Sequence, residues 1–373
     1  IKIEDLLGRA EININLRQVA EEFRGKVVLV TGAAGSIGSE LCRQLVQMGI
    51  QKLIMFDSAE TPLHNVRLEF EKKYPNIDFV PVMRVKERVR MVFDLYHPQI
   101  VFHAAAYKHV PLMEENPCEA VLVNVTGSRQ VADMAVEYGA EKMIMVSTDK
   151  AVNPTNVMGA SKRLCEMIVQ AVNNERGNKT DFVAVRFGNV LGSNGSVIPL
   201  FKRQIKSGGP VTLTHRDITR YFMLIPEAAQ LVLQAGAYAK GGEIFVLDMG
   251  KAVKIYDLAV SLIKLSGLEP NVDIPIEITG LRPGEKLYEE LLMNNDELRK
   301  TAHNKIFIDK PETISLIKLR KQIDDLIFVT KLGNKNMLID KLKEIVPTYY
   351  SPDFYNKKKL VEEVAATTLG GKE

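Results

Sequence analysis

The amino-acid sequence predicts an α/β fold in which a doubly wound parallel sheet is joined to a smaller carboxyl-terminal lobe. Between residues 26 and 187, short apolar and β-branched runs alternate with amphipathic segments of helical length, and this alternation is typical of parallel sheets. A glycine-rich turn follows the first of these runs directly. Beyond Asn189 the alternation weakens and loops with Gly, Pro and Arg become frequent, which indicates the lobe.

Six runs are predicted as strands of the sheet: 26–31, 52–57, 78–83, 100–103, 142–147 and 182–187. The segments between them have the length of helices. In the first of these segments, 36–48, Ile37, Leu41, Leu45 and Met48 recur at three- and four-residue spacing, which places them on one face of a helix. These patterns predict four parts of the chain, an amino-terminal linker or helix, a larger domain, a lobe interleaved with it and a helical tail: 1–23, 24–188, 189–301 and 302–373.

Composition excludes several classes of protein. The 373 residues are 46% hydrophobic and 25% charged, as in an ordinary globular protein with a large core. A formal net charge of +3 is too small to indicate nucleic acid as a partner, and the basic run 357–359 is interpreted as a solvated face. Cys42, Cys118 and Cys165 predict neither a disulfide framework nor a zinc site, and they suit a reducing cytosol. The histidines show no metal-ligand spacing, so no metal is predicted.

No apolar stretch approaches the roughly 18 residues needed to span a bilayer, and no signal peptide opens the chain. We therefore expect no membrane contact from these residues. The chain opens with Ile1 rather than Met, which leaves open a longer protein with an earlier membrane segment. The expected location is the cytoplasm, either free or as the cytosolic domain of an inner-membrane protein.

The turn at 31–38, with the sequence TGAAGSIG, follows a strand and opens a helix. Its glycines let a pyrophosphate approach backbone amides at the helix amino terminus, where the dipole favours negative charge. Asp57 ends the second strand 19 residues after Gly38, and its carboxylate can accept hydrogen bonds from both ribose hydroxyls while repelling a 2′-phosphate. The pattern predicts a Rossmann-like domain that binds NAD rather than NADP. Alternatively, Asp57 only caps the next helix, and both roles place it at the carboxyl edge of the sheet.

An acid and a base lie side by side where an apolar strand ends. Asp149 and Lys150 follow the strand 142–147 and precede a helix. In a cofactor fold of this kind, that strand end faces the nicotinamide, which favours chemistry over a solvated loop.

Thr148, Met158 and Lys162 occupy the pattern of the extended short-chain dehydrogenase/reductases, whose catalytic set is Ser or Thr, Tyr, and Lys four residues after the Tyr. Met158 stands where the Tyr is expected. Taken with the motifs 103–111 and 186–193, this pattern resembles the bacterial UDP-N-acetylglucosamine 4,6-dehydratases of capsule and surface-glycan biosynthesis.

The resemblance extends over roughly residues 2–292 and includes the motif RPGEK at 282–286. The opening 3–9 resembles the stretch that links transmembrane helices to the catalytic domain in long, membrane-anchored members. Met158 in place of Tyr resembles members that retain configuration at C5. Family members usually carry a Gly-Asp pair that touches adenine after the third strand, whereas 81–87 runs on as though about three residues were absent, so the recognition of adenine stays open.

The resemblance implies a reaction in which oxidation at C4 makes the C5 proton removable, water leaves across C5 and C6, and the hydride returns to C6. It assigns Lys150 as the base at C5, Asp149 as the acid at the C6 hydroxyl and Thr148 as a partner of the C4 oxygen. A lysine is a neutral base only if burial or nearby positive charge lowers its pKa, and Lys162 is expected to supply such a charge. Met158 cannot exchange a proton, so we hypothesise that Asp149, alone or through Thr148 or a water, first takes the proton at C4.

The binding residues are assigned in the same way. Guanidinium groups suit a diphosphate, and a carboxylate suits ribose hydroxyls. The expected cofactor contacts are Gly32, Ala34, Gly35, Ser36, Ile37, Gly38, Asp57, Ser58, Ala104, Ala105, Ala106 and Lys162. The expected contacts to UDP-N-acetylglucosamine are Lys108, His109, Asn189, Arg220, Arg282 and Glu285.

Two alternatives accompany these assignments. Lys108 and His109 could be surface residues, and Asn124 is expected to support the site through backbone hydrogen bonds. The protein is expected to be a homo-oligomer. The rival functions are a UDP-sugar 4-epimerase or dehydrogenase on the same fold, which normally needs the missing Tyr, and a non-catalytic NAD-binding regulatory module.

Overall fold

The computed structural model describes residues 12, 14, 16–83, 88–291, 299–309 and 312–359. The segment 3–9 and part of 81–87, on which two of the expectations above depend, lie outside these ranges.

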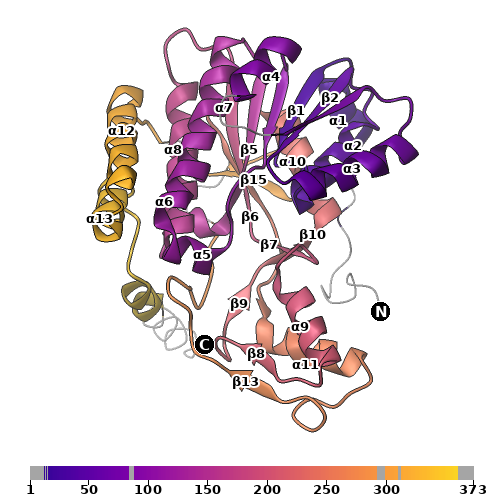
Figure 1. Ribbon diagram of the computed structural model, residues 1–373, viewed down its shortest axis with the longest axis vertical. Helices are drawn as coiled ribbons and strands as arrows, with labels where there is room; N and C mark the ends of the chain where they lie inside the picture. Colours follow the sequence, from indigo (N-terminus) through magenta and orange to yellow (C-terminus); the bar gives the residue numbers. More distant parts are fainter. Residues whose placement is uncertain are drawn as a thin grey trace, which may run out of the picture.

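A nine-stranded sheet forms the centre of the molecule (Figure 1). Its strands are β1 (Val27–Thr31), β2 (Lys52–Asp57), β3 (Phe79–Met83), β4 (Ile100–His103), β5 (Lys142–Thr148), β6 (Asp181–Phe187), β11 (Ile244–Leu247), β14 (Arg299–Lys300) and β15 (Ile306–Asp309). Their order is β14-β15-β11-β6-β5-β4-β1-β2-β3. Strands from β3 to β11 run parallel, and the chain reverses its direction of winding beside β1. The predicted doubly wound sheet is confirmed. The bounds of the six predicted strands agree with those of β1, β2, β3, β4, β5 and β6 to within one residue at either end.

Three further strands were not expected in this sheet. Strand β11 comes from the range assigned to the lobe, and β15 comes from the range expected to be a helical tail. Strand β15 pairs antiparallel with β11, placing Ile306 opposite Leu247, and β14 adds a short antiparallel edge. These strands are only four and two residues long and depend on partners distant in sequence, so their periodicity gives little signal.

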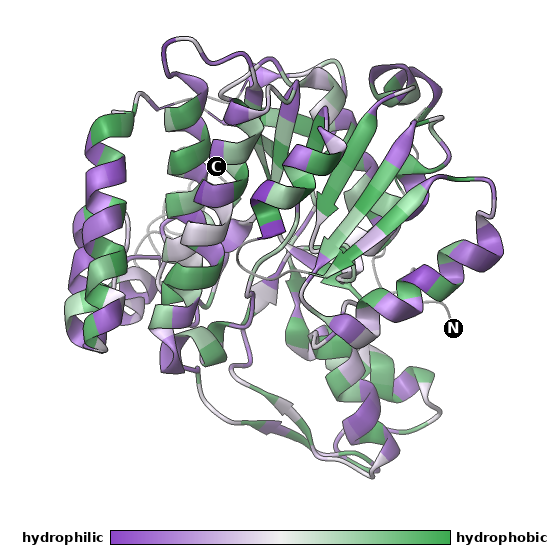
Figure 2. Cartoon of the chain, turned by 45° about the horizontal axis from the view of Figure 1, so that its top comes forward, coloured by the Kyte–Doolittle hydropathy of each residue, from purple (hydrophilic) through white to green (hydrophobic). Residues whose placement is uncertain are grey.

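Helices cover both faces of the sheet, with their apolar sides turned inward (Figure 2). One face carries α1 (Leu16–Phe23), α2 (Ser36–Leu45), α3 (Glu60–Lys73) and α10 (Ile225–Tyr238). The other carries α4 (Arg88–Tyr96), α5 (Val110–Glu115), α6 (Pro117–Ala120), a π-helical turn at Val121–Val125, α7 (Thr126–Glu137) and α8 (Val157–Asn173), with α12 (Leu316–Leu332) and α13 (Lys335–Ile345) packed outside α8.

The predicted helix 36–48 ends earlier, at Leu45, because the chain turns there and Gly49 takes a positive φ of 70°. Met48 is nevertheless buried in the core beneath the sheet, so its apolar character was interpreted correctly while its helical position was wrong.

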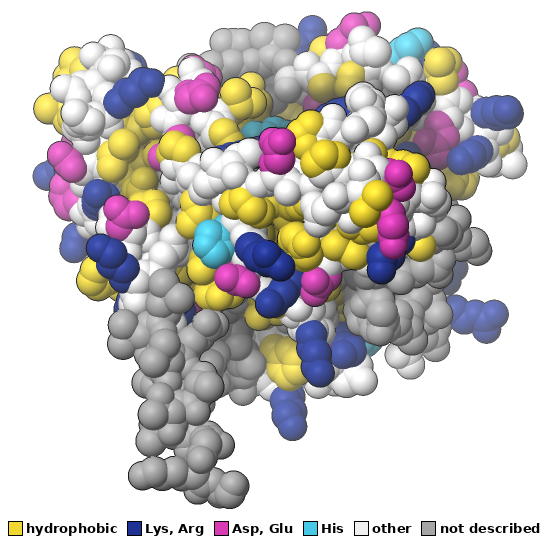
Figure 3. Space-filling view, turned by 90° about the horizontal axis from the view of Figure 1, so that it is seen from below, with side chains coloured by type: hydrophobic (Ala, Val, Ile, Leu, Met, Phe, Trp, Pro, Cys, Tyr) yellow, Lys and Arg dark blue, Asp and Glu magenta, His cyan; other side chains and the backbone are white. Residues whose placement is uncertain are grey.

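The lobe has a core of its own, which includes Phe201, Leu258 and Ile263. It is built from β7 (Asn189–Leu191), α9 (Val197–Lys206), β8 (Val211–Leu213), β9 (Thr219–Arg220), β10 (Phe222–Leu224), β12 (Val253–Lys254), α11 (Ile255–Leu265) and β13 (Ile276–Ile278). Seen from below, basic, acidic and apolar side chains are interspersed on the molecule (Figure 3). None of the described helices combines the length and apolarity needed to cross a membrane.

Candidate active site

A cavity of about 790 Å³ lies between the carboxyl ends of the sheet strands and the lobe. Its wall contains residues from both parts of the molecule. The predicted site residues that line it are Gly32, Gly35, Ser36, Ile37, Gly38, Ala104, Ala106, Lys108, His109, Thr148, Lys150, Met158, Lys162, Asn189, Arg220, Arg282 and Glu285. A second cavity of about 30 Å³ adjoins Gly32, Asp57, Ser58 and Ala105. Of the predicted set, Ala34 and Asp149 line neither cavity.

The glycine-rich turn between β1 and α2 has no room for side chains at two positions. A Cβ on Gly38 would lie 2.0 Å from the carbonyl oxygen of Gly32. A Cβ on Gly32, whose φ is +67°, would lie 2.7 Å from the backbone of Ala104. At these two positions the turn therefore presents only backbone beside the amino terminus of α2, which is the arrangement that admits a phosphate.

Asp57 is tied to this turn by its own hydrogen bonds. Its Oδ2 accepts from the backbone N of Ala34 at 2.9 Å, and its Oδ1 accepts from the backbone N of Ala59 at 2.9 Å. The carboxylate thus links the turn to the start of α3 and borders the smaller cavity. It lies at the carboxyl edge of the sheet, as both sequence interpretations required.

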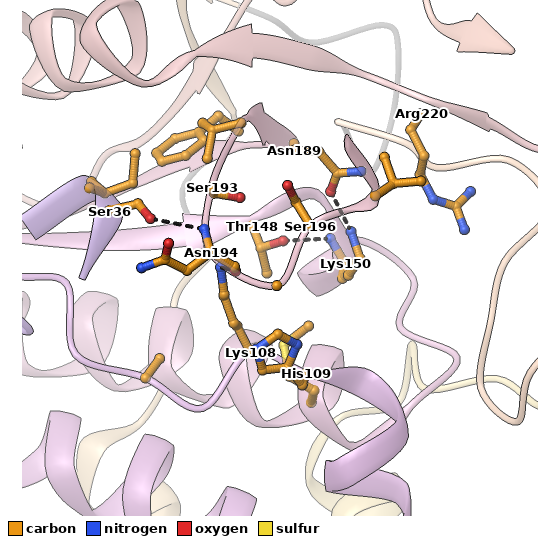
Figure 4. A pocket seen from close by; sticks show the side chains of 18 of the residues that line it. Ser36, Lys108, His109, Thr148, Lys150, Asn189, Ser193, Asn194, Ser196 and Arg220 are labelled. Atoms are coloured by element: carbon orange, nitrogen blue, oxygen red, sulfur yellow. Dashed lines mark hydrogen bonds between the residues drawn. The ribbon is translucent and has the colours of Figure 1, made fainter. Parts of the chain in front are cut away.

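The loop 193–196, at the start of the lobe, lines the cavity (Figure 4). The backbone N of Asn194 donates to Ser36 Oγ at 3.3 Å, and its carbonyl accepts from Lys108 Nζ at 3.0 Å. The His109 ring packs against Gly195, where a Cβ would approach within 2.7 Å. Both side chains are exposed and line the cavity, and partial burial lowers the pKa values of Lys108 and His109.

Two buried residues support the wall of the cavity. Asn124 accepts a hydrogen bond from the backbone N of Tyr107 at 2.8 Å and donates to its carbonyl at 3.0 Å, as expected from the sequence. Lys162, on α8, donates to the carbonyl of Val146 at 2.8 Å. This contact fixes the Lys162 ammonium on the strand that carries the acid–base pair.

The pair itself occupies a single 3-10 turn, Asp149–Ala151, between β5 and α8. Lys150 lines the cavity with 17% of its side chain exposed, whereas Asp149 is completely buried behind it. Helix α8 can approach because Gly159 faces the carbonyl of Lys150, where a Cβ would lie only 2.2 Å away. Met158 is placed on the same helix and contributes to the cavity wall.

Thr148 connects the cavity to the buried carboxylate. Its hydroxyl donates to Asp149 Oδ1 at 3.0 Å, and Lys150 Nζ donates to the same oxygen at 3.1 Å. Asp149 Oδ2 has no hydrogen-bond partner among the described residues. It points toward Gly188, where a Cβ would come within 2.9 Å of it. One carboxylate oxygen therefore accepts two hydrogen bonds, and the other is buried against Gly188.

The electrostatics of the pair differ from the sequence expectation. Burial raises the pKa of Asp149, and it opposes the lowering effect of Lys150. Burial alone would lower the pKa of Lys150, but the carboxylates of Asp149 and Glu289 raise it above its ordinary value. Lys150 therefore rests as an ammonium group, and the expected lowering by Lys162 does not prevail.

Two buried residues were missed by the sequence analysis. Glu289 Oε1 lies 3.7 Å from Lys150 Nζ, and its Oε2 lies 4.0 Å from Lys286 Nζ. Both side chains are almost completely buried, with exposures of 2% and 1%. Lys286 closes the motif at 282–286 but was given no role, and the signal for Glu289 was a charged pair that also suits a solvated loop.

On the lobe side of the cavity, Arg220 and Glu285 are bonded to each other. Arg220 Nη2 lies 3.3 Å from Glu285 Oε1 and donates to the carbonyl of Lys286 at 3.0 Å. Thr214 also donates to Glu285 Oε1, at 3.1 Å. Arg282 is exposed on the same wall. The structure thus brings together a glycine-rich turn at a helix amino terminus, an adjacent carboxylate and amine, and a polar lobe wall.

Comparison with known proteins gives a consistent result. The profile of the family described as "Polysaccharide biosynthesis protein" matches residues 28–311. Capsular polysaccharide biosynthesis protein CapD of Staphylococcus aureus is 53% identical over 331 residues, which are 88% of this chain and 55% of that protein. The chain therefore spans about half the length of this relative.

Two relatives of more similar length have named activities. A UDP-N-acetylglucosamine 4,6-dehydratase (inverting) of Campylobacter jejuni is 34% identical over 320 residues, or 85% of this chain and 91% of that protein. A UDP-glucose 4-epimerase of Rickettsia canadensis is 35% identical over 279 residues, or 74% and 80%. Among solved structures, Pen from Bacillus thuringiensis has a TM-score of 0.70 and 34% identity, and the match covers 81% of this chain and 99% of that one.

Proposed function

The chain belongs to the polysaccharide biosynthesis protein family, and we propose that it is an NAD-dependent 4,6-dehydratase of UDP-N-acetylglucosamine. The product would be a UDP-4-keto-6-deoxy-N-acetylhexosamine for surface-glycan synthesis. The observation that carries this proposal is the pair Asp149 and Lys150, of which Lys150 lines the cavity of about 790 Å³ and Asp149 lies buried behind it, while Met158 stands in place of the expected Tyr. The name of the C. jejuni relative supports the choice of substrate.

The residues present fit NAD. Side chains at Gly32 and Gly38 would collide with the neighbouring backbone, so the turn leaves a cradle that backbone amides can offer to a pyrophosphate. Asp57 borders the adjoining small cavity with a carboxylate suited to ribose hydroxyls. Lys162, fixed on Val146, would hold the nicotinamide ribose. When bound, NAD supplies a reversible hydride acceptor for C4 of the sugar.

The proton steps can be assigned to the residues of the chain. Asp149 takes the proton of the C4 hydroxyl through Thr148, whose hydroxyl bridges cavity and carboxylate. A ketone at C4 makes the C5 proton acidic enough for neutral Lys150 to remove it. Asp149 then gives its proton, again through the Thr148 hydroxyl, to the departing C6 hydroxyl, and Lys150 returns its own proton to C5. Two protons are taken up and two are given back.

This sequence requires Lys150 to lose one proton before the C5 step, because it rests as an ammonium group. The proposed stereochemistry follows from the use of a single base. If Lys150 removes and returns the C5 proton, both events occur on one face of the sugar, and the configuration is retained. An inverting enzyme needs a second proton donor on the other face, and the thioether of Met158 cannot serve.

The test is incubation of the purified protein with UDP-N-acetylglucosamine in deuterated water, followed by NMR. We expect a 6-deoxy-4-keto product that carries deuterium at C5 and keeps the original C5 configuration. A product inverted at C5 would contradict the single-base assignment, and binding of NAD without turnover would favour a non-catalytic module.

The rival activity, UDP-sugar 4-epimerisation, has one observation in its favour, the similarity to the Rickettsia epimerase. An epimerase has no use for a base at C5. In the same experiment it would give a C4 epimer with the C6 hydroxyl intact and no deuterium at C5.

A further inference from the structure

The ammonium group of Lys150 is surrounded by three side-chain oxygens from different parts of the chain. Asp149 Oδ1 lies at 3.1 Å, Asn189 Oδ1 at 3.3 Å and Glu289 Oε1 at 3.7 Å. Asp149 belongs to the same turn, and Asn189 begins a strand of the lobe (Figure 4). Glu289 comes from the segment that returns from the lobe toward the sheet and does not line the cavity. It is therefore placed to act on Lys150 and not on the sugar.

On its other side Glu289 faces a second lysine, and its Oε2 has no hydrogen-bond partner among the described residues. Lys286 Nζ lies 4.0 Å from Glu289 Oε2, donates to the carbonyl of Val152 and stands 4.4 Å from the centre of the Tyr355 ring. The positive charges of Lys150, Arg220 and Lys286 lower the pKa of Glu289 against the effect of burial. Glu289 is thus a buried carboxylate that stays ionised beside the proposed base.

We propose that Glu289 is a positioning residue of the reaction, whose buried negative charge fixes the Lys150 amino group beside the sugar and sets how readily that group releases its proton. This inference rests on the proposed role of Lys150 as the base at C5. The charged groups that act on Lys150 include the carboxylates of Asp149 and Glu289, the guanidinium of Arg220, and the amino group of Lys286, whose own pKa is lowered by burial.

The sign of the effect follows from electrostatics. A nearby negative charge favours the ammonium form of a lysine, so removing it lowers the lysine pKa and increases the neutral fraction at a given pH. Each unit of pKa changes that fraction about tenfold while the ammonium form dominates. Glu289 therefore makes the neutral amine of Lys150 a stronger base, but it reduces the fraction of Lys150 that is neutral near neutral pH.

The experiment measures Lys150 directly, without substrate. Cyanate reacts with neutral amines, and its reaction with Lys150 in the full-length protein can be followed by peptide mass spectrometry at about pH 8. We expect Lys150 in Glu289→Gln to react about tenfold faster than in the wild type. An unchanged rate would overturn the proposal.

The chain offers a matched control and a variant of opposite sign. Glu290, the next residue, pairs with Lys359 at 2.6 Å and accepts from Asn153 at 3.0 Å, so Glu290→Gln should leave the labelling rate of Lys150 unchanged. Lys286→Met removes a positive charge from the far side of Glu289. The negative charge of Glu289 then acts on Lys150 without this opposing charge and favours its ammonium form, so Lys150 should react more slowly than in the wild type. Faster labelling of Lys150 in all three variants would indicate a general loosening of the site and would overturn the proposal. If Glu289→Gln does not fold, Lys286→Met still tests it.

A second readout concerns turnover. The acid limb of the pH profile of kcat should move down by about one pH unit in Glu289→Gln, with little change in KM, because Glu289 does not reach the cavity. If Glu289→Gln is active and this limb does not move, the role of Glu289 is overturned while the proposed function stands. Absence of dehydration in the wild type would instead overturn the proposed function, while the labelling result would still report whether Glu289 controls Lys150.

Discussion

The hydroxyl of Thr148 donates a hydrogen bond to Asp149 Oδ1 at 3.0 Å, so a residue that lines the cavity is joined to one that is sealed behind it. If this bond carries the C4 proton, Thr148→Val should lower turnover about a hundredfold or more, because the methyl group cannot pass a proton. Steady-state kinetics with UDP-N-acetylglucosamine would measure this loss. Thr148→Ser keeps the hydroxyl and should retain most of the activity, whereas an equal loss in both variants would indicate a packing role.

Replacing Lys150 should separate the two halves of the reaction. Lys150→Met keeps the length of the side chain but has no amino group, so the C5 proton should no longer exchange with solvent deuterium. Oxidation at C4 should continue, because the proposed base for that step is Asp149. A single-turnover measurement of nicotinamide absorbance would follow the C4 step, and NMR would follow C5. Deuterium at C5 in this variant would assign the base to another residue.

Gly188 leaves the space into which the free oxygen of Asp149 points. A Cβ there would lie 2.9 Å from Asp149 Oδ2 and 3.1 Å from Met249 Sδ, so Gly188→Ala should displace the carboxylate by a few tenths of an ångström or more. Misplacement of a reacting group by about 1 Å can cost about a hundredfold in rate. We expect a loss of up to this size in kcat with binding of NAD unchanged, and calorimetric titration would check the binding. Wild-type kcat would show that Asp149 Oδ2 is not used.

The ion pair of Arg186 and Glu166 should make folding sensitive to acid. Both side chains are completely buried and their atoms approach to 2.8 Å. Burial alone would raise the pKa of Glu166, but Arg186 and Arg163 lower it to about 2. Because this pKa is depressed, the carboxylate adds stability above its ordinary pKa of about 4.5, and this contribution is lost as the pH falls toward about 2.

Glu166→Gln should therefore reduce the free energy of unfolding near neutral pH by about 3–5 kcal/mol, because it leaves Arg186 buried without its main partner. Its stability should also fall less steeply than that of the wild type between about pH 5 and pH 2. Urea denaturation followed by circular dichroism would measure both effects. Glu312 is a matched control, since it pairs with Arg163 at 2.8 Å but is about half exposed, and Glu312→Gln should cost less than about 1 kcal/mol.

The sheet and the cavity wall were accessible from the sequence because their signals are local. The strand 142–147 has an unbroken apolar run at 143–146, and the turn 31–38 has glycines where a helix begins. The extra strands were not accessible, because β15 is stabilised by pairing with β11 some 60 residues earlier, as the partners Ile306 and Leu247 illustrate.

The proton chemistry of Lys150 was also beyond the sequence. Its protonation state depends on Glu289, which is 139 positions away and approaches only after the lobe has folded back on the sheet. Nothing in the spacing of charged residues distinguishes Glu289 from Glu290, although only the former faces the base.

The placement of β11 and β15 divides the lobe into two segments of the chain that each begin and end in the central sheet. The chain leaves the central sheet after β6, returns for β11, leaves again and returns for β14 and β15. The lobe therefore consists of two excursions whose ends are anchored in this sheet. A change within either excursion is therefore not confined to the lobe, because Asn189 of the first and Glu289 of the second both reach Lys150 at the edge of the sheet.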